Sequence, residues 1–99
     1  MSYQVLVTRE AEDDLDAIVP FRRNRILDAM ERYLVHQPRQ ESRSRIKRLR
    51  QIDSPEFRLR VDDYRVFYDV DDIQLDVTVL RVLSKVDSIR YLETLENVL

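Results

Sequence analysis

The sequence predicts a small α+β fold, in which strands form an antiparallel sheet and two N-terminal helices pack on one face of it. Tyr3–Thr8 alternates apolar and polar residues, as a half-buried strand does. Apolar residues at helical spacing follow as far as Pro38, and three strand-like segments then precede a last helical segment. Because a chain of 99 residues builds one hydrophobic core, we expect a single domain over residues 1–99.

Two helices are expected between the first strand and Pro38. Thr8 suits the N-cap of the first helix, because its hydroxyl can accept a hydrogen bond from a free backbone N–H. Pro20 suits the first turn of the second helix, where its missing N–H is not needed. The apolar stripe of the second helix contains Ile26, Leu27, Met30, Tyr33 and Leu34.

The second half of the chain predicts three strands and a closing helix, which gives the order β-α-α-β-β-β-α. The strands are Glu56–Val61, Tyr64–Val70 and Leu75–Leu83. The basic stretch 39–50 is expected to be a connector, in which a short strand could form. Asp87 or Ser88 is the expected cap of the last helix. Its buried side would carry Ile89, Leu92, Leu95 and Leu99.

The composition excludes several classes of site. The chain has no glycine, so it lacks the glycine-rich loops that bind dinucleotides and nucleoside triphosphates. It has no cysteine and one histidine, His36, so we expect neither disulfides nor a metal site, and no cofactor. Because the sequence shows no signal peptide or membrane span, we expect a cytoplasmic protein without membrane contacts.

Charge is unevenly distributed along the chain. The formal net charge is −2, but residues 39–65 carry a net charge of +4 between two acidic segments. A local basic region of this kind indicates an anion-binding patch. A solvated basic loop would give the same pattern, and charge alone does not separate the two.

The segment around Asp62-Asp63 predicts a hairpin with a fixed register. If these two residues form the turn, Arg60 pairs with Arg65, and Arg58 joins them on one face by period-two alternation. Like charges opposite each other on a sheet repel, so something should offset the repulsion. A polyanion could do so, since the guanidinium fork binds phosphate. The alternative is neutralisation by nearby acids, namely Glu56, Asp69 and Asp76.

Two stretches of sequence resemble the RelE/ParE superfamily of toxins from type II toxin–antitoxin systems. They are FRLRVDDYRVFYDVDD (57–72) and VTVLRVLSK (77–85), followed by a closing helix. The family's usual glycine–aspartate turn is Asp62-Asp63 here. The resemblance implies a cognate antitoxin as partner. It also implies one of two activities, because RelE-like members cut mRNA on the ribosome whereas ParE-like members poison DNA gyrase.

The RelE-like activity, an endoribonuclease that inhibits translation, is the leading hypothesis. It needs no metal, because the RNA 2′-hydroxyl attacks the adjacent phosphorus while the protein moves protons and stabilises negative charge. By position, Arg58, Arg65 and Lys85 match the family's phosphate-facing cations, and Tyr91 matches its catalytic C-terminal tyrosine. Tyr91 could equally be a half-buried packing residue. Glu56 stands where the best-known RelE type has a lysine, and it could itself act as a base.

Further cations are candidates for binding the RNA backbone. Arg81 ranks lower among them, because its parity on the last strand opposes that of Arg65. A ParE-like gyrase inhibitor, or a degenerate toxin that only binds its antitoxin, remains an alternative. The antitoxin is expected to add a strand or helix to an exposed sheet edge and to cover or displace the last helix. The RNA-binding candidates are Lys47, Arg48, Arg50, Arg60 and Arg81.

Overall fold

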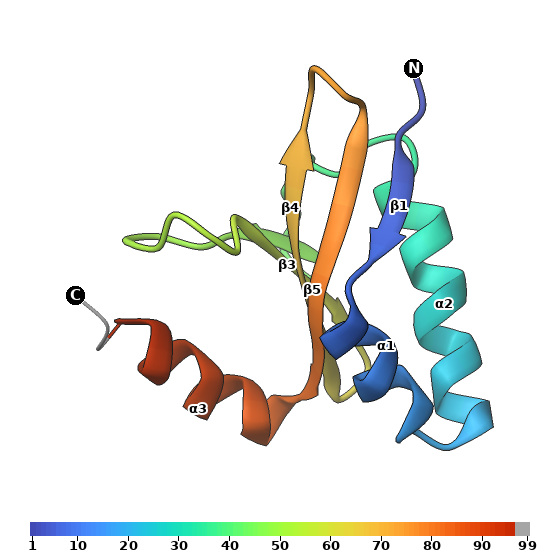
Figure 1. Ribbon diagram of the computed structural model, residues 1–99, viewed down its shortest axis with the longest axis vertical. Coiled ribbons are helices and arrows are strands. Elements are labelled where there is room, and N and C mark those ends of the chain that lie inside the picture. The colour runs from blue at the N-terminus through green and yellow to red at the C-terminus, as the bar shows by residue number, and fades with distance from the viewer. Residues whose placement is uncertain (97–99) are drawn as a thin grey trace.

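The computed structural model describes residues 1–96 and contains three helices and five strands (Figure 1). Within these residues no helix is long and apolar enough to cross a membrane. In chain order the elements are β1 (Gln4–Val7), α1 (Arg9–Asp16), α2 (Pro20–Leu34), β2 (Ile46–Arg48), β3 (Phe57–Val61), β4 (Tyr64–Asp71), β5 (Asp76–Ser84) and α3 (Lys85–Glu96).

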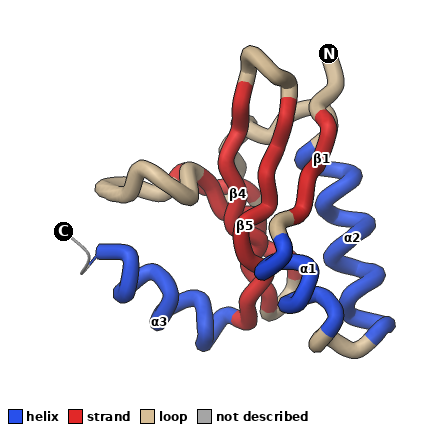
Figure 2. The backbone as a smooth tube through the Cα atoms, in the orientation of Figure 1, coloured by secondary structure: helices blue, strands red, loops and turns tan. Residues whose placement is uncertain are grey.

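The five strands form one sheet in the order β1-β5-β4-β3-β2, and the predicted α+β class is confirmed (Figure 2). The short strand β2 lies within the basic connector and forms one edge. Contrary to the all-antiparallel expectation, β1 pairs with β5 in parallel. The chain leaves β1 directly into α1 and α2, and it returns through the hairpins to place the last strand beside the first. Such a helical crossover is what a parallel pair requires.

The hydrophobic core lies between the sheet and the two N-terminal helices, which cover one face (Figure 1). Ile26, Met30 and Leu34 of α2 are buried there, as the helical spacing predicts. Leu27 is not, because its side chain points away from the sheet and is 41% exposed. The strands contribute Ile46, Phe57, Leu59, Val61, Val66, Tyr68, Val70, Val77, Val79 and Val82.

The first helix begins as predicted, whereas the last does not. Thr8 Oγ1 accepts a hydrogen bond from the backbone N–H of Ala11 at 3.2 Å, so Thr8 is the N-cap. The last helix begins at Lys85, earlier than the predicted caps Asp87 and Ser88 allow. Ser84 is the residue that takes up a free N–H there, since its Oγ accepts from the N–H of Asp87 at 3.1 Å.

The last helix stands away from the open face of the sheet instead of lying flat on it (Figure 1). As a result the predicted burial of Ile89 is wrong, because this side chain is 55% exposed. Leu92 and Leu95 are half-buried, and only Ser88 is buried. The predicted position of Leu99 lies outside the described residues. The helix therefore leaves much of the open face accessible.

Candidate nucleic-acid interface

The hairpin of β3 and β4 has the predicted register, with Arg60 opposite Arg65 and Arg58 opposite Phe67. Asp62 adopts the left-handed backbone conformation (φ 53°) that this turn requires and that aspartate tolerates. Lys47 of β2 lies opposite Arg58. We call Arg58, Arg60 and Arg65 the hairpin arginines; they share the sheet face opposite α1 and α2.

Arg81 lies on this same face, so its predicted opposite parity is wrong. It pairs with Phe67, whereas Val79 pairs with Tyr68, so Leu80 has no partner on β4. This β-bulge inserts one extra residue into β5 and reverses the alternation beyond it. Val82 consequently lies under the helices in the core, and Arg81 joins the row formed by Lys47, Arg58 and Phe67.

The hairpin arginines have no carboxylate partners in the part of the chain that the structure describes. Within residues 1–96, no carboxylate oxygen lies within 4.0 Å of their side-chain nitrogens. Burial, and then the neighbouring charge of Arg60, lowers the pKa of Arg58. Burial also lowers the pKa of Arg65, with further contributions from Arg58 and Arg60. The cations therefore repel one another, and Asp63 offsets part of this effect for Arg65 without coming within ion-pair distance.

Arg65 is the most enclosed of the three. Arg65 is buried, and its Nη1 donates to the carbonyl oxygens of Tyr64 at 2.9 Å and Asp62 at 3.2 Å. Arg58 is half-buried and makes one long contact, 3.5 Å from its Nη1 to the carbonyl oxygen of Arg45. Arg60 is exposed. Arg65 thus supports the turn, while Arg58 and Arg60 are the accessible cations.

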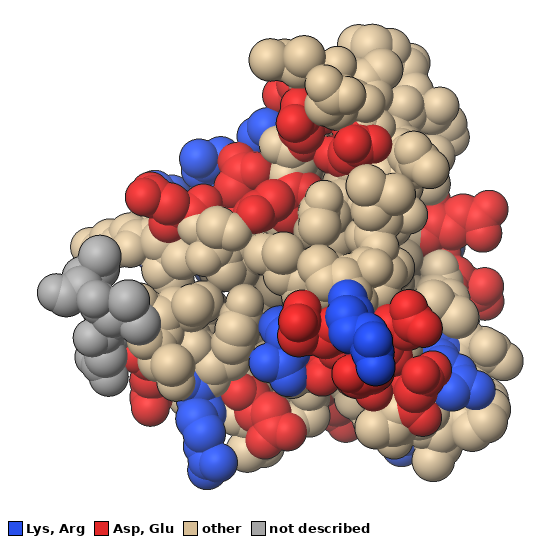
Figure 3. All heavy atoms as spheres, viewed as in Figure 1, with Lys and Arg blue, Asp and Glu red and all other residues tan. Residues whose placement is uncertain are grey.

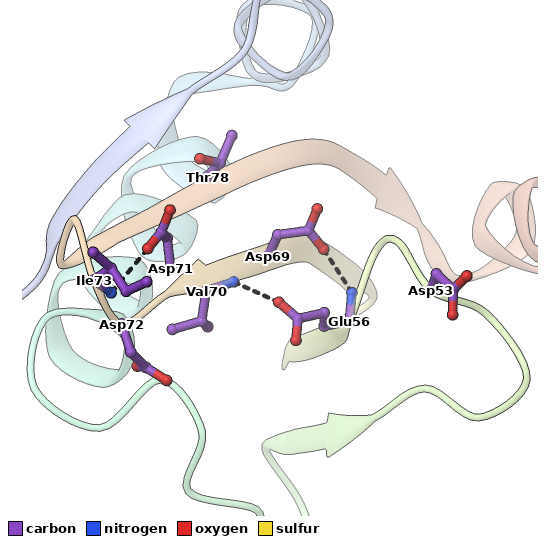
Figure 4. A pocket seen from close by; sticks show the side chains of 8 residues that line it. All are labelled: Asp53, Glu56, Asp69, Val70, Asp71, Asp72, Ile73 and Thr78. Carbon is purple, nitrogen blue, oxygen red and sulfur yellow. Dashed lines mark hydrogen bonds between the residues drawn. The ribbon is translucent and has the colours of Figure 1, made fainter.

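Two of the three acids that could have neutralised the hairpin arginines, Glu56 and Asp69, lie in a separate acidic pocket (Figure 4). The third, Asp76, lies opposite Asp71 at the start of β5. Glu56 Oε1 accepts from the N–H of Val70 at 2.9 Å, and Asp69 accepts from the N–H of Glu56 at 2.8 Å. Figure 3 shows carboxylates gathered over this part of β4 and β5. Since Glu56 joins β3 to β4 inside this pocket, its position does not suit a base beside the arginines. The pocket is lined by Asp53, Glu56, Asp69, Val70, Asp71, Asp72, Ile73 and Thr78.

Lys85 and Tyr91 connect the last helix to the part of the open face that carries the hairpin arginines, Lys47 and Arg81. We call this part the cationic face. The backbone N–H of Lys85 donates to the carbonyl oxygen of Asp63 at 2.7 Å, which ties the start of α3 to the hairpin turn, and its side chain is exposed. The ring of Tyr91 packs on Phe67, with centroids 5.0 Å apart and planes tilted by 57°. Burial raises the pKa of Tyr91, and the charge of Arg81 partly counteracts it. Tyr91 is therefore a packing residue that also lies beside Arg81.

Two of the predicted RNA-binding residues lie elsewhere. Arg48 lies opposite Phe57, and its guanidinium is 5.5 Å from that ring, on the helix-covered side of β2. Arg50 is exposed in the loop that follows β2. Sequence reasoning missed Arg45, whose Nη1 donates to the carbonyl oxygen of Arg60 at 3.3 Å. It also missed Asp14 of α1, which binds Arg81. Neither contact has a local sequence signal.

Within residues 1–96 no group of three His, Asp or Glu side chains is arranged to hold a metal ion. The predicted site residues gathered at the hairpin end of the open face are instead cations and one phenol. They could bind phosphate and donate hydrogen bonds to it. The predicted residues that the structure brings together are Lys47, Arg58, Arg60, Arg65, Arg81, Lys85 and Tyr91.

Comparison with known proteins agrees with this architecture. Residues 5–88 match the family model of the ParE toxin of the type II toxin–antitoxin system parDE, and the chain therefore belongs to this family. No curated protein matches the chain.

Several solved structures share the fold. The RelBE2 toxin–antitoxin complex of Mycobacterium tuberculosis contains a chain 26% identical to this one, with a TM-score of 0.66; the match covers 85% of this chain and 99% of that chain. A mutant of the Escherichia coli toxin RelE in the free state is 24% identical over 100% of both chains, with a TM-score of 0.73. The archaeal RelE–RelB complex of Pyrococcus horikoshii is 22% identical over 85% of this chain and 96% of that one, with a TM-score of 0.64.

Proposed function

We propose that this type II toxin is a ribosome-dependent endoribonuclease that cleaves mRNA and so inhibits translation. One observation supports the proposal above all: the hairpin arginines lie together on an open face, without carboxylate partners among residues 1–96, and Tyr91 packs on Phe67 of the same face. A polyanion bound across this face would remove their mutual repulsion. The RNA backbone is such a polyanion.

The proposed reaction uses the RNA's own 2′-hydroxyl as nucleophile. Its oxygen bonds to the adjacent phosphorus, the bond from phosphorus to the 5′-oxygen breaks, and a cyclic phosphate remains. One proton leaves the 2′-oxygen and one is delivered to the 5′-oxygen. Arg58 and Arg60, with Lys85, would stabilise the negative charge on the phosphorane oxygens, and Arg65 would hold the hairpin that presents them. Tyr91 would transfer one of the two protons.

Inhibition of DNA gyrase is the second candidate function. The family model matched by the chain is that of ParE, the type that the resemblance associates with gyrase. Two contacts favour it: Nη1 of Arg65 is engaged by backbone carbonyls, and Tyr91 packs on Phe67. A toxin that acts by binding gyrase would need the cations for contact and would need no proton transfer by Tyr91.

We also propose a cognate antitoxin as partner, since the related toxins of Mycobacterium tuberculosis and Pyrococcus horikoshii form complexes with theirs. An antitoxin segment with carboxylates could cover Arg58 and Arg60 and neutralise them. The edge strand β2 offers a second contact, because its outer side has no neighbouring strand in the sheet. Either contact would keep mRNA from the cationic face.

Induced expression of the chain without its antitoxin tests the proposal. We expect incorporation of labelled amino acids to stop rapidly, with new mRNA 5′ ends inside translated codons. Purified toxin should make the same cuts on programmed ribosomes. Arg43→Ala is the control substitution, because Arg43 is exposed in the loop before β2 and its loss should leave the cuts unchanged. Loss of thymidine incorporation with intact mRNA would contradict the nuclease and support gyrase as target.

A further inference from the structure

Asp14 of α1 is joined to Tyr91 of α3 through Arg81. The Asp14 carboxylate receives two hydrogen bonds from the Arg81 guanidinium, 2.7 Å from Nε to Oδ2 and 3.0 Å from Nη2 to Oδ1. The same guanidinium lies 5.7 Å from the centroid of the Tyr91 ring. Tyr91 in turn packs on Phe67 of the cationic face. These contacts form a continuous path from one side of the sheet to the other.

The path exists because the pairing of β1 and β5 stops early. The last residue pair is Val7 with Val79, so this edge of β5 has no strand beside it from Leu80 onward. The carbonyl oxygen of Leu80 accepts a hydrogen bond from the Thr8 hydroxyl at 3.0 Å. Asp14 takes the place of a strand there, since its Oδ2 also accepts from the N–H of Val82 at 2.9 Å. The bulge at Leu80 turns Arg81 to the open face, and its side chain reaches round this free edge to Asp14.

The ion pair is more buried than a surface pair. The Asp14 side chain is 14% exposed and that of Arg81 is 35% exposed, and two parallel hydrogen bonds fix the plane of the guanidinium. A guanidinium fixed in this way leaves its face free to lie against an aromatic ring. By contrast, the neighbouring pair of Arg9 with Asp13 is long, at 3.8 Å, and largely exposed.

We propose that Asp14 and Arg81 are positioning residues that hold the Tyr91 ring over the cationic face, so that α1 takes part in building the reaction site. Neither residue is expected to touch the RNA. This inference extends the proposed nuclease function, in which Tyr91 transfers a proton. The coupling of Asp14 to Tyr91 is nevertheless a property of the free toxin and can be measured there.

The charges around Tyr91 move the pKa of its phenol in opposite directions, so the sign of a pKa shift in a variant reports the coupling. Arg81 lowers the pKa of the phenol, whereas Asp14 and Asp69 raise it. Glu10 of α1 raises the pKa of Arg81. Asp87 and Arg90 of α3 line a pocket that is also lined by Arg81 and Tyr91. Removing the Arg81 charge should therefore raise the pKa of Tyr91. Removing the Asp14 charge should lower it, because Arg81 is then uncompensated.

The test is a pH titration of the free, full-length toxin by NMR, with tyrosine labelled with ¹³C at the ζ carbon. Tyr91→Phe assigns the signal among the five tyrosines. We expect Arg81→Met to shift the Tyr91 midpoint upward and Asp14→Asn to shift it downward. Asp13→Asn, one residue away and exposed, should leave it unchanged. General loosening of the fold would move both variants in the same direction, so opposite signs support the positioning role.

Equal shifts, or no shift in either variant, would overturn the proposal whether or not the toxin is a nuclease. If Asp14→Asn does not fold, the upward shift in Arg81→Met still decides the matter. In the ribosome assay we expect both variants to cleave about tenfold to a hundredfold more slowly, the range that a misplaced catalytic group produces. Coupled NMR shifts without any cleavage by the wild type would contradict the nuclease function but leave the positioning of Tyr91 intact.

Discussion

The two ends of the open face carry opposite charges, and these charges differ in whether they are hydrogen-bonded within the protein. In the acidic pocket, four of the five carboxylates accept hydrogen bonds within the protein, from backbone N–H groups, Ser54, Tyr3 or Arg39. The hairpin arginines lack such partners among residues 1–96, apart from backbone carbonyls. Charges satisfied internally stabilise the fold, whereas charges left unpaired are available to a ligand. We therefore infer that the acidic end stabilises the fold and that the cationic end binds a ligand.

The largest expected effect is at the cationic end. Replacing Arg58 by alanine should reduce mRNA cleavage about a hundredfold to a thousandfold, as loss of a group that stabilises transition-state charge does. The free energy of unfolding should stay the same or rise slightly, because Arg58 is repelled by Arg60. Cleavage on programmed ribosomes and thermal unfolding measure the two quantities. A marked loss of stability would mean that Arg58 is structural and would remove the contrast between the two ends.

At the acidic end we expect the reverse. Glu56→Ala should lower the free energy of unfolding by about 2 kcal/mol, because the N–H of Val70 loses its acceptor in a partly buried position. Cleavage by the folded variant should be unchanged. Denaturant unfolding tests this, with Asp76→Ala as the control, since no hydrogen bond to the Asp76 side chain is found in the described part of the chain. Loss of cleavage at full stability would instead make Glu56 a base.

Tyr68 extends the comparison to the covered face beneath the acidic pocket. Its buried hydroxyl donates to the carbonyl oxygen of Pro38 at 2.6 Å, so Tyr68→Phe should cost about 1 kcal/mol of stability. Burial raises the pKa of Tyr68 far above its usual value near 10. The folded state thus keeps the phenol proton at pH values where the unfolded chain loses it, and stability should fall as pH rises above about 10. Unfolding of Tyr68→Phe at several pH values should show a weaker decline.

The smallest effect concerns the salt dependence of RNA binding. If Arg60 contacts one phosphate, Arg60→Ala should reduce the slope of log K against log salt concentration by about 0.7, the value for one contact on a single strand. Titration of a non-cleavable RNA at several salt concentrations measures this slope. Arg50→Ala, outside the cationic face, should leave it unchanged. An equal decrease in both variants would mean that the toxin binds RNA over a diffuse surface.

Local patterns predict most of the fold. The register of the hairpin followed from counting outward from Asp62-Asp63, because a two-residue turn fixes every later pair. Thr8 and Pro20 marked the starts of α1 and α2 through their own backbone chemistry. The start of α3 was misplaced because Ser84, still within β5, supplies the acceptor for Asp87.

The candidate site was less predictable, because it depends on contacts between distant residues. The face of the sheet on which Arg81 lies depends on a bulge that no sequence pattern near Leu80 predicts. Its partner Asp14 lies 67 positions earlier in the chain. The acids expected near the hairpin arginines were assigned by sequence distance, whereas hydrogen bonds to Val70, Ser54 and the Glu56 backbone hold two of them, Glu56 and Asp69, in another pocket.

The bulge in β5 makes the length of this strand more important than the identity of its middle residue. Leu80 is half-buried and has no partner on β4, so substitutions there should be tolerated. Deletion of the same residue would remove the bulge and leave Arg81 on the open face and Val82 in the core. Insertion of one further residue after Leu80, with the bulge unchanged, would instead turn Arg81 and Leu83 inward beneath the helices, while Val82 turned out. A guanidinium placed in that apolar layer without a partner would outweigh the marginal stability of a small domain. Insertions after Leu80 in β5 should therefore be far rarer among functional variants than substitutions of Leu80 or its deletion.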